Sequence, residues 1–168
     1  MFEATIDHGL AKPALYDALA ASLASLLDGE TDALANLANA SGLLAETLER
    51  VNWCGFYLLR GGELVLGPFQ GRPACVRIAL GKGVCGTAAQ KRESLVVPDV
   101  NAFPGHIACD AASRSEIVIP IVAGGALFGV LDVDSPDPGR FDDEDRSGLE
   151  HFVRVLTPRV AWEQLGCG

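Results

Sequence analysis

The chain has 168 residues, of which 22 are acidic and 13 are basic, so its formal net charge is −9. Its length fits a single domain with a sizeable core, and without a cluster of lysine and arginine to neutralise phosphates we expect no nucleic-acid partner. No apolar run approaches the roughly 18 residues of a membrane span, and the first residues lack the pattern of a secretory signal, so we expect a cytoplasmic protein that binds no membrane.

Two amphipathic helices are predicted first, over residues 13–48. In the earlier helix the leucines recur with helical spacing: Leu15, Leu19, Leu23, Leu26 and Leu27. Gly29 stands where a C-terminal cap would, and Asp32 can cap the second helix. Ser41 and Gly42 weaken the middle of this second helix and could divide it. Nothing in either helix suggests catalysis, so we assign both to the scaffold.

After the helices the apolar period changes to two, which predicts a β-hairpin with Gly61 and Gly62 at its turn. Alternation places Trp53 and Tyr57 on one face of the first strand and Cys54 on the opposite, purely apolar face. Two large rings with polar tips can wall an apolar pocket, but they can equally be core, and this hairpin does not decide between the two. We assign Cys54 to packing.

A glycine-rich stretch, residues 81–86 (GKGVCG), surrounds Cys85 and leads into a helix expected to start near Val84. Its spacing is neither that of a Walker loop nor that of a dinucleotide fingerprint, so it gives little support for nucleotide binding. Backbone N–H groups in such a loop could bind a small carboxylate. An ordinary turn would have the same sequence, and both readings stay open.

Cys109 lies in residues 105–116 (GHIACDAASRSE), which link a turn-rich stretch to the most apolar strand of the sequence. The segment is too rich in Gly, Ala and Ser to be a packed element, so the thiol could meet a small molecule. A lone cysteine of this kind is ordinarily a half-buried loop residue. The chain has five cysteines, however, and no export signal, which argues for thiols that are metal ligands, catalytic groups or core.

Two carboxylates, Asp132 and Asp134, end an otherwise apolar strand on the face that alternation also assigns to Phe128 and Val130. Packing does not explain charges in such a position, because buried carboxylates are costly without partners. They either bind something or form a solvated strand end beside an acidic turn.

The turn before that strand decides whether a third acid joins them. A three-residue loop, 123–125, would pair Val122 with Ala126 and bring Glu116 opposite Asp132 on the same face. A two-residue Gly-Gly turn would put Glu116 on the other face. We expect the three-residue loop, and therefore three converging acids. Like charges this close raise one pKa, so that one acid can stay protonated and donate a proton.

A final helix is predicted over residues 142–165. Asp142 can cap it, acidic residues follow in the first turn, and apolar residues recur with helical spacing: Leu149, Phe152, Val153 and Leu156. Pro158 should end or kink the helix. Cys167 falls in a tail that we expect to be frayed, and we assign it no role.

Six segments between about residues 51 and 149 make a specific combination: 52–57 (NWCGFY), 69–71 (FQG) with Cys75, 81–88 (GKGVCGTA), 105–111 (GHIACDA), 115–117 (SEI) and 129–135 (GVLDVDS). Together they resemble the free methionine-(R)-sulfoxide reductases, which are single GAF-domain enzymes. The resemblance implies an α+β fold, with a GAF-like antiparallel sheet of about six strands and helices packed on its faces. It implies one domain over residues 1–168, with helices at 13–48, the sheet and active-site loops at 51–134, and a C-terminal helix at 142–165.

The resemblance also implies reduction of free L-methionine-(R)-sulfoxide to L-methionine. Cys109 matches the nucleophile that attacks the sulfoxide sulfur and becomes a sulfenic acid. Cys75 matches the principal resolving cysteine and Cys85 a secondary one, and the disulfide that forms is reduced by thioredoxin. The resemblance implies a homodimer, and it implies neither a metal nor a bound cofactor.

In the family's active site, Glu116, Asp132 and Asp134 match an acidic set that binds substrate and protonates the sulfoxide oxygen as sulfur is attacked. Trp53 and Tyr57 match residues around the methyl-sulfoxide end. As our own inference, the backbone of the 81–86 loop could take the α-carboxylate of the substrate.

Other classes of protein remain open. A GAF domain can be a small-molecule sensor without catalysis, although the sequence shows no output domain. A zinc module could use His106 and Cys109 with two further cysteines, but the cysteines lack the closely spaced pairs of structural zinc sites. A general thiol peroxidase would have little use for three clustered acids.

Overall fold

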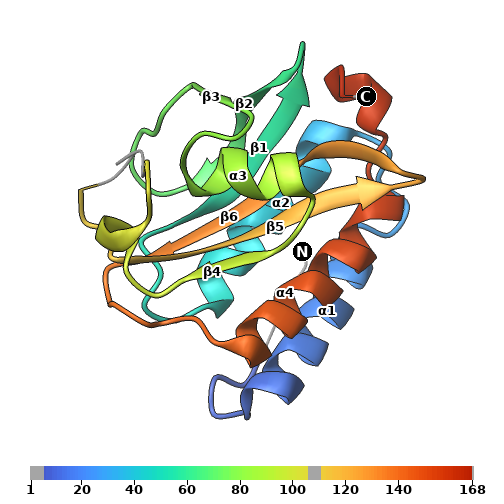
Figure 1. Ribbon diagram of the computed structural model, residues 1–168. Coiled ribbons are helices and arrows are strands. Elements are labelled where there is room, and N and C mark those ends of the chain that lie inside the picture. The colour runs from blue at the N-terminus through green and yellow to red at the C-terminus, as the bar shows by residue number, and fades with distance from the viewer. Residues whose placement is uncertain (1–5, 106–110, 168) are drawn as a thin grey trace.

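The structure is a computed structural model that describes residues 6–105 and 111–167. Its centre is one antiparallel sheet in which six strands follow the order β3-β2-β1-β6-β5-β4 (Figure 1). The strands are β1 (Trp53–Arg60), β2 (Glu63–Gln70), β3 (Arg77–Ala79), β4 (Leu95–Val97), β5 (Ser115–Ala123) and β6 (Ala126–Ser135). The predicted α+β fold with about six antiparallel strands is confirmed.

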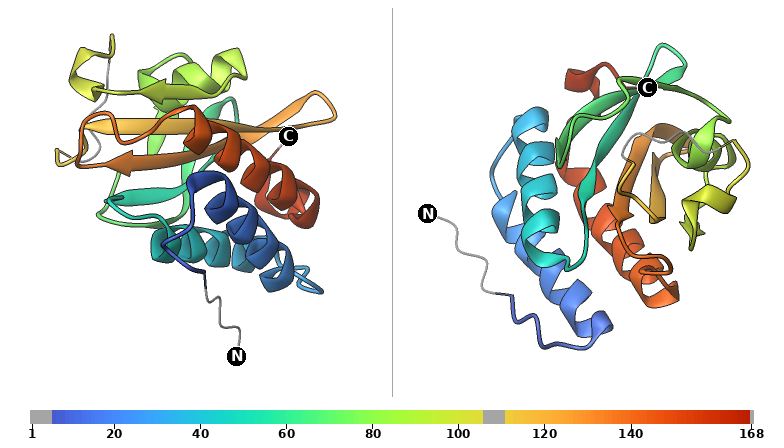
Figure 2. Two further views of the ribbon diagram at one scale, coloured as in Figure 1. Left: turned by 90° about the horizontal axis from the view of Figure 1, so that it is seen from below. Right: turned by 90° about the vertical axis from the view of Figure 1, so that its left-hand side faces the viewer.

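Helices cover both faces of this sheet. They are α1 (Lys12–Leu26), α2 (Ala33–Thr47), α3 (Gly83–Lys91) and α4 (Asp143–Leu156). Figure 2 shows α1, α2 and α4 on one face and α3 on the other. The larger apolar core lies under the three helices and contains Phe56, Ile119 and Phe152, whereas the smaller one lies under α3 and contains Tyr57 and Val130. None of these helices is long and apolar enough to cross a membrane.

The second helix is capped as its sequence predicts. The Asp32 side chain accepts a hydrogen bond from the Ala35 N–H at 2.8 Å. The helix continues without a break through Ser41 and Gly42, and the Ser41 hydroxyl donates to the Ala38 carbonyl at 2.8 Å. Packing of α2 against the sheet therefore overrides the weak helix propensity of the Ser-Gly pair.

The last α-helix is shorter than the predicted span of 142–165. α4 ends two residues before Pro158, and two 3₁₀ helices follow, Thr157–Arg159 and Trp162–Leu165. Proline lacks an N–H group and its ring clashes with the preceding turn, so the α-helical ladder stops there.

The tail after α4 is packed rather than frayed. Trp162 stacks on Phe128 of β6 with ring centroids 5.1 Å apart, and its Nε1 donates to the Thr157 carbonyl at 2.9 Å. Cys167 is buried in the larger core, with 8% of its surface exposed. The expectation of a frayed tail at Cys167 is wrong, because the sequence does not show the aromatic contact that anchors this segment.

The turn between β5 and β6 differs from the predicted three-residue loop. Ala123 pairs with Ala126, so only Gly124 and Gly125 form the turn, with φ values of +58° and +81°. A turn with both central residues at positive φ matches the right-handed twist of the strands, and glycine reaches this conformation without strain. The expected pairing of Val122 with Ala126 is therefore wrong.

A β-bulge follows this turn and changes its effect. Val122 pairs with Leu127 while Ile121 pairs with Gly129, so Phe128 is an extra residue on β6. Leu127 consequently belongs to the smaller core and Phe128 packs on the helical side, which corrects the prediction that Phe128 shares a face with Val130. Beyond the bulge, the carboxyl-terminal half of β6 again has the orientation that the three-residue loop would have given it.

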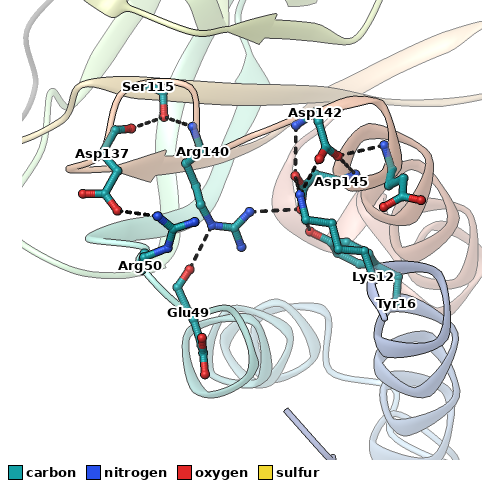
Figure 3. Close-up of polar contacts among 10 residues, drawn as sticks. Lys12, Tyr16, Glu49, Arg50, Ser115, Asp137, Arg140, Asp142 and Asp145 are labelled. Atoms are coloured by element: carbon teal, nitrogen blue, oxygen red, sulfur yellow. Dashed lines mark hydrogen bonds and ion pairs between the residues drawn. The ribbon is translucent and has the colours of Figure 1, made fainter. Parts of the chain in front are cut away.

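A buried ionic network fixes α4 against α1 (Figure 3). Asp145 is fully buried and accepts hydrogen bonds from the Tyr16 hydroxyl at 2.8 Å, from Lys12 Nζ at 2.6 Å and from Arg140 at 3.1 Å. It also accepts from the Asp142 N–H at 2.9 Å and so completes a capping box. Because each oxygen of this buried carboxylate has two donors, the charge is compensated.

The same network reaches the start of β5. Arg140 donates from Nε to the Glu49 carbonyl at 3.1 Å, and its backbone N–H donates to the Ser115 hydroxyl at 3.3 Å. Ser115 in turn donates to the Asp137 carbonyl at 2.6 Å. The residue immediately before Glu116 is thus bonded to Asp137, just beyond β6. Through Arg140 it is also connected to Glu49, just beyond α2, and to Asp145 of α4 (Figure 3).

Candidate active site

Three stacked aromatic rings lie on the α3 side of the sheet. Trp53 and Tyr57 of β1 have centroids 5.8 Å apart, and Phe69 of β2 stacks on Trp53 at 5.2 Å. Gly55 lies between the two β1 rings and opposite Phe69 in the register, and a Cβ at this position would overlap the Phe69 side chain. The predicted common face of Trp53 and Tyr57 is confirmed. The stacking of Phe69 was missed, because Phe69 lies opposite Gly55 only through a register shift between β1 and β2 that the sequence does not show.

The polar tips of two rings hold the segment that contains Cys75. Trp53 Nε1 donates to the Arg72 carbonyl at 3.1 Å, and the Tyr57 hydroxyl donates to the Cys75 carbonyl at 3.1 Å. Gly71 permits this close approach, since a Cβ there would lie 2.5 Å from Trp53 Cδ1. The face formed by the three stacked rings, called the ring face below, therefore fixes the backbone of Cys75 beside the smaller core.

Three acids converge at the end of the same face. Glu116 pairs with Asp134 across β5 and β6, and Asp134 pairs in turn with Trp53 of β1. Asp132 lies two residues before Asp134 on β6, opposite Val118 rather than opposite Glu116 as predicted. The bulge in β6 keeps all three on the α3 side, so the predicted convergence holds even though the predicted partner does not.

Cys85 also belongs to this cluster, and it comes from α3, the helix that covers this face of the sheet. The Cys85 Sγ donates to Glu116 Oε1 at 3.7 Å. This sulfur and one carboxylate oxygen from each of Glu116 and Asp132 all lie within 4.8 Å of one another. Glu116 and Asp132 are each only 6% exposed. Within residues 6–105 and 111–167, Asp132 Oδ1 is buried and has no hydrogen-bond partner.

Burial shifts the protonation of this cluster toward its neutral forms. Burial, and then the Asp132 charge, raise the pKa of Glu116 well above its usual value, and burial raises the pKa of Asp132 to about 7. Burial and the nearby carboxylates Asp132 and Glu116 also raise the pKa of the Cys85 thiol. Two carboxyl groups this close hold a proton between them, and we place it mainly on Glu116, whose pKa the Asp132 charge raises further.

The cysteines fall into separate environments. Cys75 is disulfide-bonded, whereas Cys54, Cys85 and Cys167 are free and buried. Cys54 lies on the helical side, where its thiol donates to the Ser41 carbonyl at 3.6 Å, as expected for a packing residue. Cys109, the predicted nucleophile, lies outside the described residues, as does His106.

Ser113 and Arg114 are anchored beside the acids. Asn52 Nδ2 donates to the Ser113 hydroxyl at 3.1 Å, and the Arg114 N–H donates to the Ser135 carbonyl at 2.7 Å. Ser113 is therefore held next to the start of β1 and the end of β6, where Asp134 stands.

The 81–86 loop offers fewer free amides than its sequence suggests. The Gly81 N–H donates to the Gly86 carbonyl at 2.7 Å, and the Lys82 N–H donates to the Ala79 carbonyl at 3.1 Å. The helix begins at Gly83, and the N–H groups of its first turn have no acceptor within the helix. A carboxylate would therefore bind at this first turn rather than across the whole loop.

Comparisons with known proteins agree with this architecture. The GAF domain family matches residues 14–161. The chain is 54% identical over 150 residues to the free methionine-R-sulfoxide reductase of Escherichia coli, which covers 89% of this chain and 91% of the relative. It is 44% identical over 158 residues to the enzyme of the same name from Saccharomyces cerevisiae, covering 89% and 88% of the two chains.

A solved structure extends the likeness to three dimensions. The free methionine-R-sulfoxide reductase from Neisseria meningitidis, determined in complex with its substrate, is 42% identical and superimposes with a TM-score of 0.92. The alignment covers 98% of this chain and 99% of that one. With matches of this identity and coverage, and with the acids and rings gathered on one face of a GAF sheet, the chain belongs to the free methionine-R-sulfoxide reductases.

Proposed function

We propose that this protein reduces free L-methionine-(R)-sulfoxide to L-methionine, with Cys109 as the nucleophile. The observation that carries the proposal is the buried cluster of Glu116, Asp132 and Cys85 at the edge of the aromatic face. A largely neutral acid, an unpaired carboxylate oxygen and stacked rings in one place suit a small zwitterion that carries a polar S=O group. The relatives named for this activity support the same substrate.

The acids can recognise the free amino acid. Asp132 Oδ1, buried and without a partner among the described residues, needs a donor, and the α-ammonium of a free amino acid is one. Asp134 adjoins it and adds negative charge. In a peptide this nitrogen is an uncharged amide, so the cluster would favour free methionine sulfoxide over the peptide-bound form. The first turn of α3 would take the α-carboxylate.

The redox chemistry follows from the sulfur atoms. The Cys109 thiolate attacks the sulfoxide sulfur while the sulfoxide oxygen takes a proton, which Glu116 is placed to supply. Oxygen passes to Cys109 as a sulfenic acid and methionine leaves, so sulfur of the substrate is reduced and the thiol is oxidised. The Cys75 thiol then displaces water from the sulfenic acid, which forms a disulfide, and thioredoxin returns both thiols by exchange.

Cys75 is the better of the two resolving candidates. Among the described residues, Cys75 is disulfide-bonded, whereas Cys54, Cys85 and Cys167 are free. In the proposed mechanism, the disulfide that forms joins Cys75 to Cys109. Resolution requires a thiolate, and burial beside two carboxylates disfavours the thiolate of Cys85. Cys85 would resolve only as a secondary group.

Three further features of the proposal come from the family resemblance. Thioredoxin is the external reductant, without a bound cofactor; the protein works in the cytoplasm; and it forms a homodimer. Sedimentation of the purified chain at several concentrations tests the dimer, and replacing thioredoxin with glutaredoxin in the assay tests the reductant.

The decisive experiment uses separated R and S epimers of methionine sulfoxide, each free and within a peptide, with a thioredoxin system and NADPH consumption as the readout. We expect turnover of the free R epimer alone. Turnover of the peptide-bound form at the same kcat/KM would overturn the role given to the acids. No turnover of any epimer, with tight binding of the free amino acid, would favour the sensor without catalysis.

A further inference from the structure

The side chains of Cys85, Glu116 and Asp132 bring a thiol and two carboxyl groups close to one another in a buried place. They come from three elements, α3, β5 and β6, and present a sulfur and two carboxylate oxygens within 4.8 Å of one another. Zinc bonds of about 2.3 Å to sulfur and about 2.0–2.2 Å to oxygen place tetrahedral ligands roughly 3.5 Å apart. The distance of 3.7 Å from Cys85 Sγ to Glu116 Oε1 is already close to that value, and rotation of the carboxylates can close the rest.

The electrostatics of the cluster also favour a cation. Asp132 is 6% exposed, and its Oδ1 is buried with no hydrogen-bond partner among residues 6–105 and 111–167. Within the same residues, neither Asp132 nor Glu116 forms an ion pair with a lysine, arginine or histidine. A buried carboxylate oxygen without a donor is costly, and a bound cation removes that cost.

We propose that Cys85, Glu116 and Asp132 bind a thiophilic divalent cation such as Zn²⁺ or Cd²⁺. One thiolate with two carboxylates is a mixed set that selects such ions over Mg²⁺ and Ca²⁺, which take oxygen ligands alone. Three protein ligands leave the fourth tetrahedral position to water. Binding releases the protons that the thiol and the carboxyl pair hold, and these pass to the solvent.

The metal site overlaps the place that the proposed function gives to the substrate's α-ammonium. This consequence depends on that function: the cation and free methionine sulfoxide then exclude one another, and thiophilic metals inhibit the reductase. Occupancy would also fix Glu116 in its ionised form, in which it has no proton to give.

The test uses the oxidised full-length chain, in which Cys75 is kept in its disulfide, so that this thiol cannot bind metal. Cd²⁺ is titrated while the ultraviolet charge-transfer band of the Cd–thiolate bond is recorded, and equilibrium dialysis gives the stoichiometry. We expect one Cd²⁺ per chain. Cys85→Ser should abolish the band, whereas Cys54→Ser should leave it intact, because Cys54 lies on the opposite side of the sheet.

Asp132→Asn is a second variant for the case in which Cys85→Ser fails to fold. It is suitable because asparagine has nearly the same shape as aspartate. It should weaken Cd²⁺ binding by at least about tenfold. A band that survives in Cys85→Ser, or an unchanged affinity in a folded Asp132→Asn chain, would overturn the site.

Competition separates this proposal from the proposed function. Free methionine-(R)-sulfoxide at saturation should weaken Cd²⁺ binding by at least about tenfold, and the S epimer should have a smaller effect. Binding of Cd²⁺ through Cys85 without competition would establish the metal site and overturn its overlap with the substrate. Competition without the Cys85 band would overturn the metal site alone.

Discussion

Glu116 stands opposite Asp134 because Phe128 is an extra residue in β6. Without the bulge, the two-residue Gly-Gly turn would have placed Glu116 on the opposite face of the sheet from Asp132 and Asp134. The bulge one step beyond the turn reverses this change, since one additional residue moves every later side chain of β6 to the other face. Where the acids gather thus depends on a local irregularity more than 10 Å along the strand from them, at roughly 3.3 Å per residue.

The bulge makes Gly129 sensitive to substitution. A Cβ there would overlap the Tyr57 carbonyl oxygen on the neighbouring strand, so Gly129→Ala should lower the free energy of unfolding by about 1–3 kcal/mol, measured by urea denaturation. Gly42→Ala is the matched control, since nothing lies within 4 Å of a Cβ in this helical position. It should stabilise the protein by about 0.5–1 kcal/mol. Equal effects of the two changes would contradict the bulge geometry.

Cys75→Ser should separate the first chemical step from recycling. The variant should release about one methionine per chain, because sulfenic acid formation does not need Cys75, and should then fail to turn over with thioredoxin. Quenched single-turnover assays and steady-state NADPH loss measure the two steps. Cys109→Ser is the control and should release none. Normal steady-state turnover in Cys75→Ser would transfer the resolving role to Cys85.

Glu116→Gln and Asp134→Asn should affect different kinetic constants. Glu116→Gln removes a proton used in the transition state, so its single-turnover rate should fall by about a hundredfold or more with little change in substrate binding. Asp134→Asn removes charge that attracts the α-ammonium, so KM should rise by about tenfold. Wild-type kcat in Glu116→Gln would refute the proton-donor role.

Tyr57→Phe tests whether the ring face positions the resolving cysteine. The change keeps the ring beside Trp53 but removes the hydroxyl that donates to the Cys75 carbonyl at 3.1 Å. Loss of one hydrogen bond of about 1 kcal/mol should slow disulfide formation by about fivefold. The first methionine should still be released at the wild-type rate. A slower first release with normal disulfide formation would show that Tyr57 acts on the substrate alone.

The ion pair at the start of α4 predicts a stability change in acid. The hydrogen bond from Lys12 lowers the pKa of Asp142 to about 2, from an ordinary value of 3.8. A carboxylate whose pKa is lower in the folded protein than in the unfolded chain stabilises the fold. For Asp142 this contribution is complete above pH 3.8 and disappears as the pH falls through about 2. Asp142→Asn keeps a good N-cap residue but loses the charge. The stability difference between wild type and Asp142→Asn should therefore shrink between pH 4 and pH 2, and a constant difference would contradict the pairing.

The sequence alone determined most of the fold and the chemical content of the site. Helical spacing, glycine turns and alternation give the order of elements, because these patterns depend on local geometry and on which side of each element is apolar. The common face of Trp53 and Tyr57, the packing role of Cys54 and the cap at Asp32 were all predictable in this way. Two carboxylates on an apolar strand marked the site because packing cannot explain them.

Only the tertiary structure decided the register and the contacts between distant segments. The pairing of Glu116 with Asp134 depends on the bulge at Phe128, and that bulge is stabilised by cross-strand and helix contacts that no local pattern records. The burial of Cys167 and the contact between Cys85 and Glu116 likewise join residues far apart in the chain. Such contacts follow from how the layers close on one another, and each depends on the summed packing energy of the whole core rather than on the propensity of its own segment.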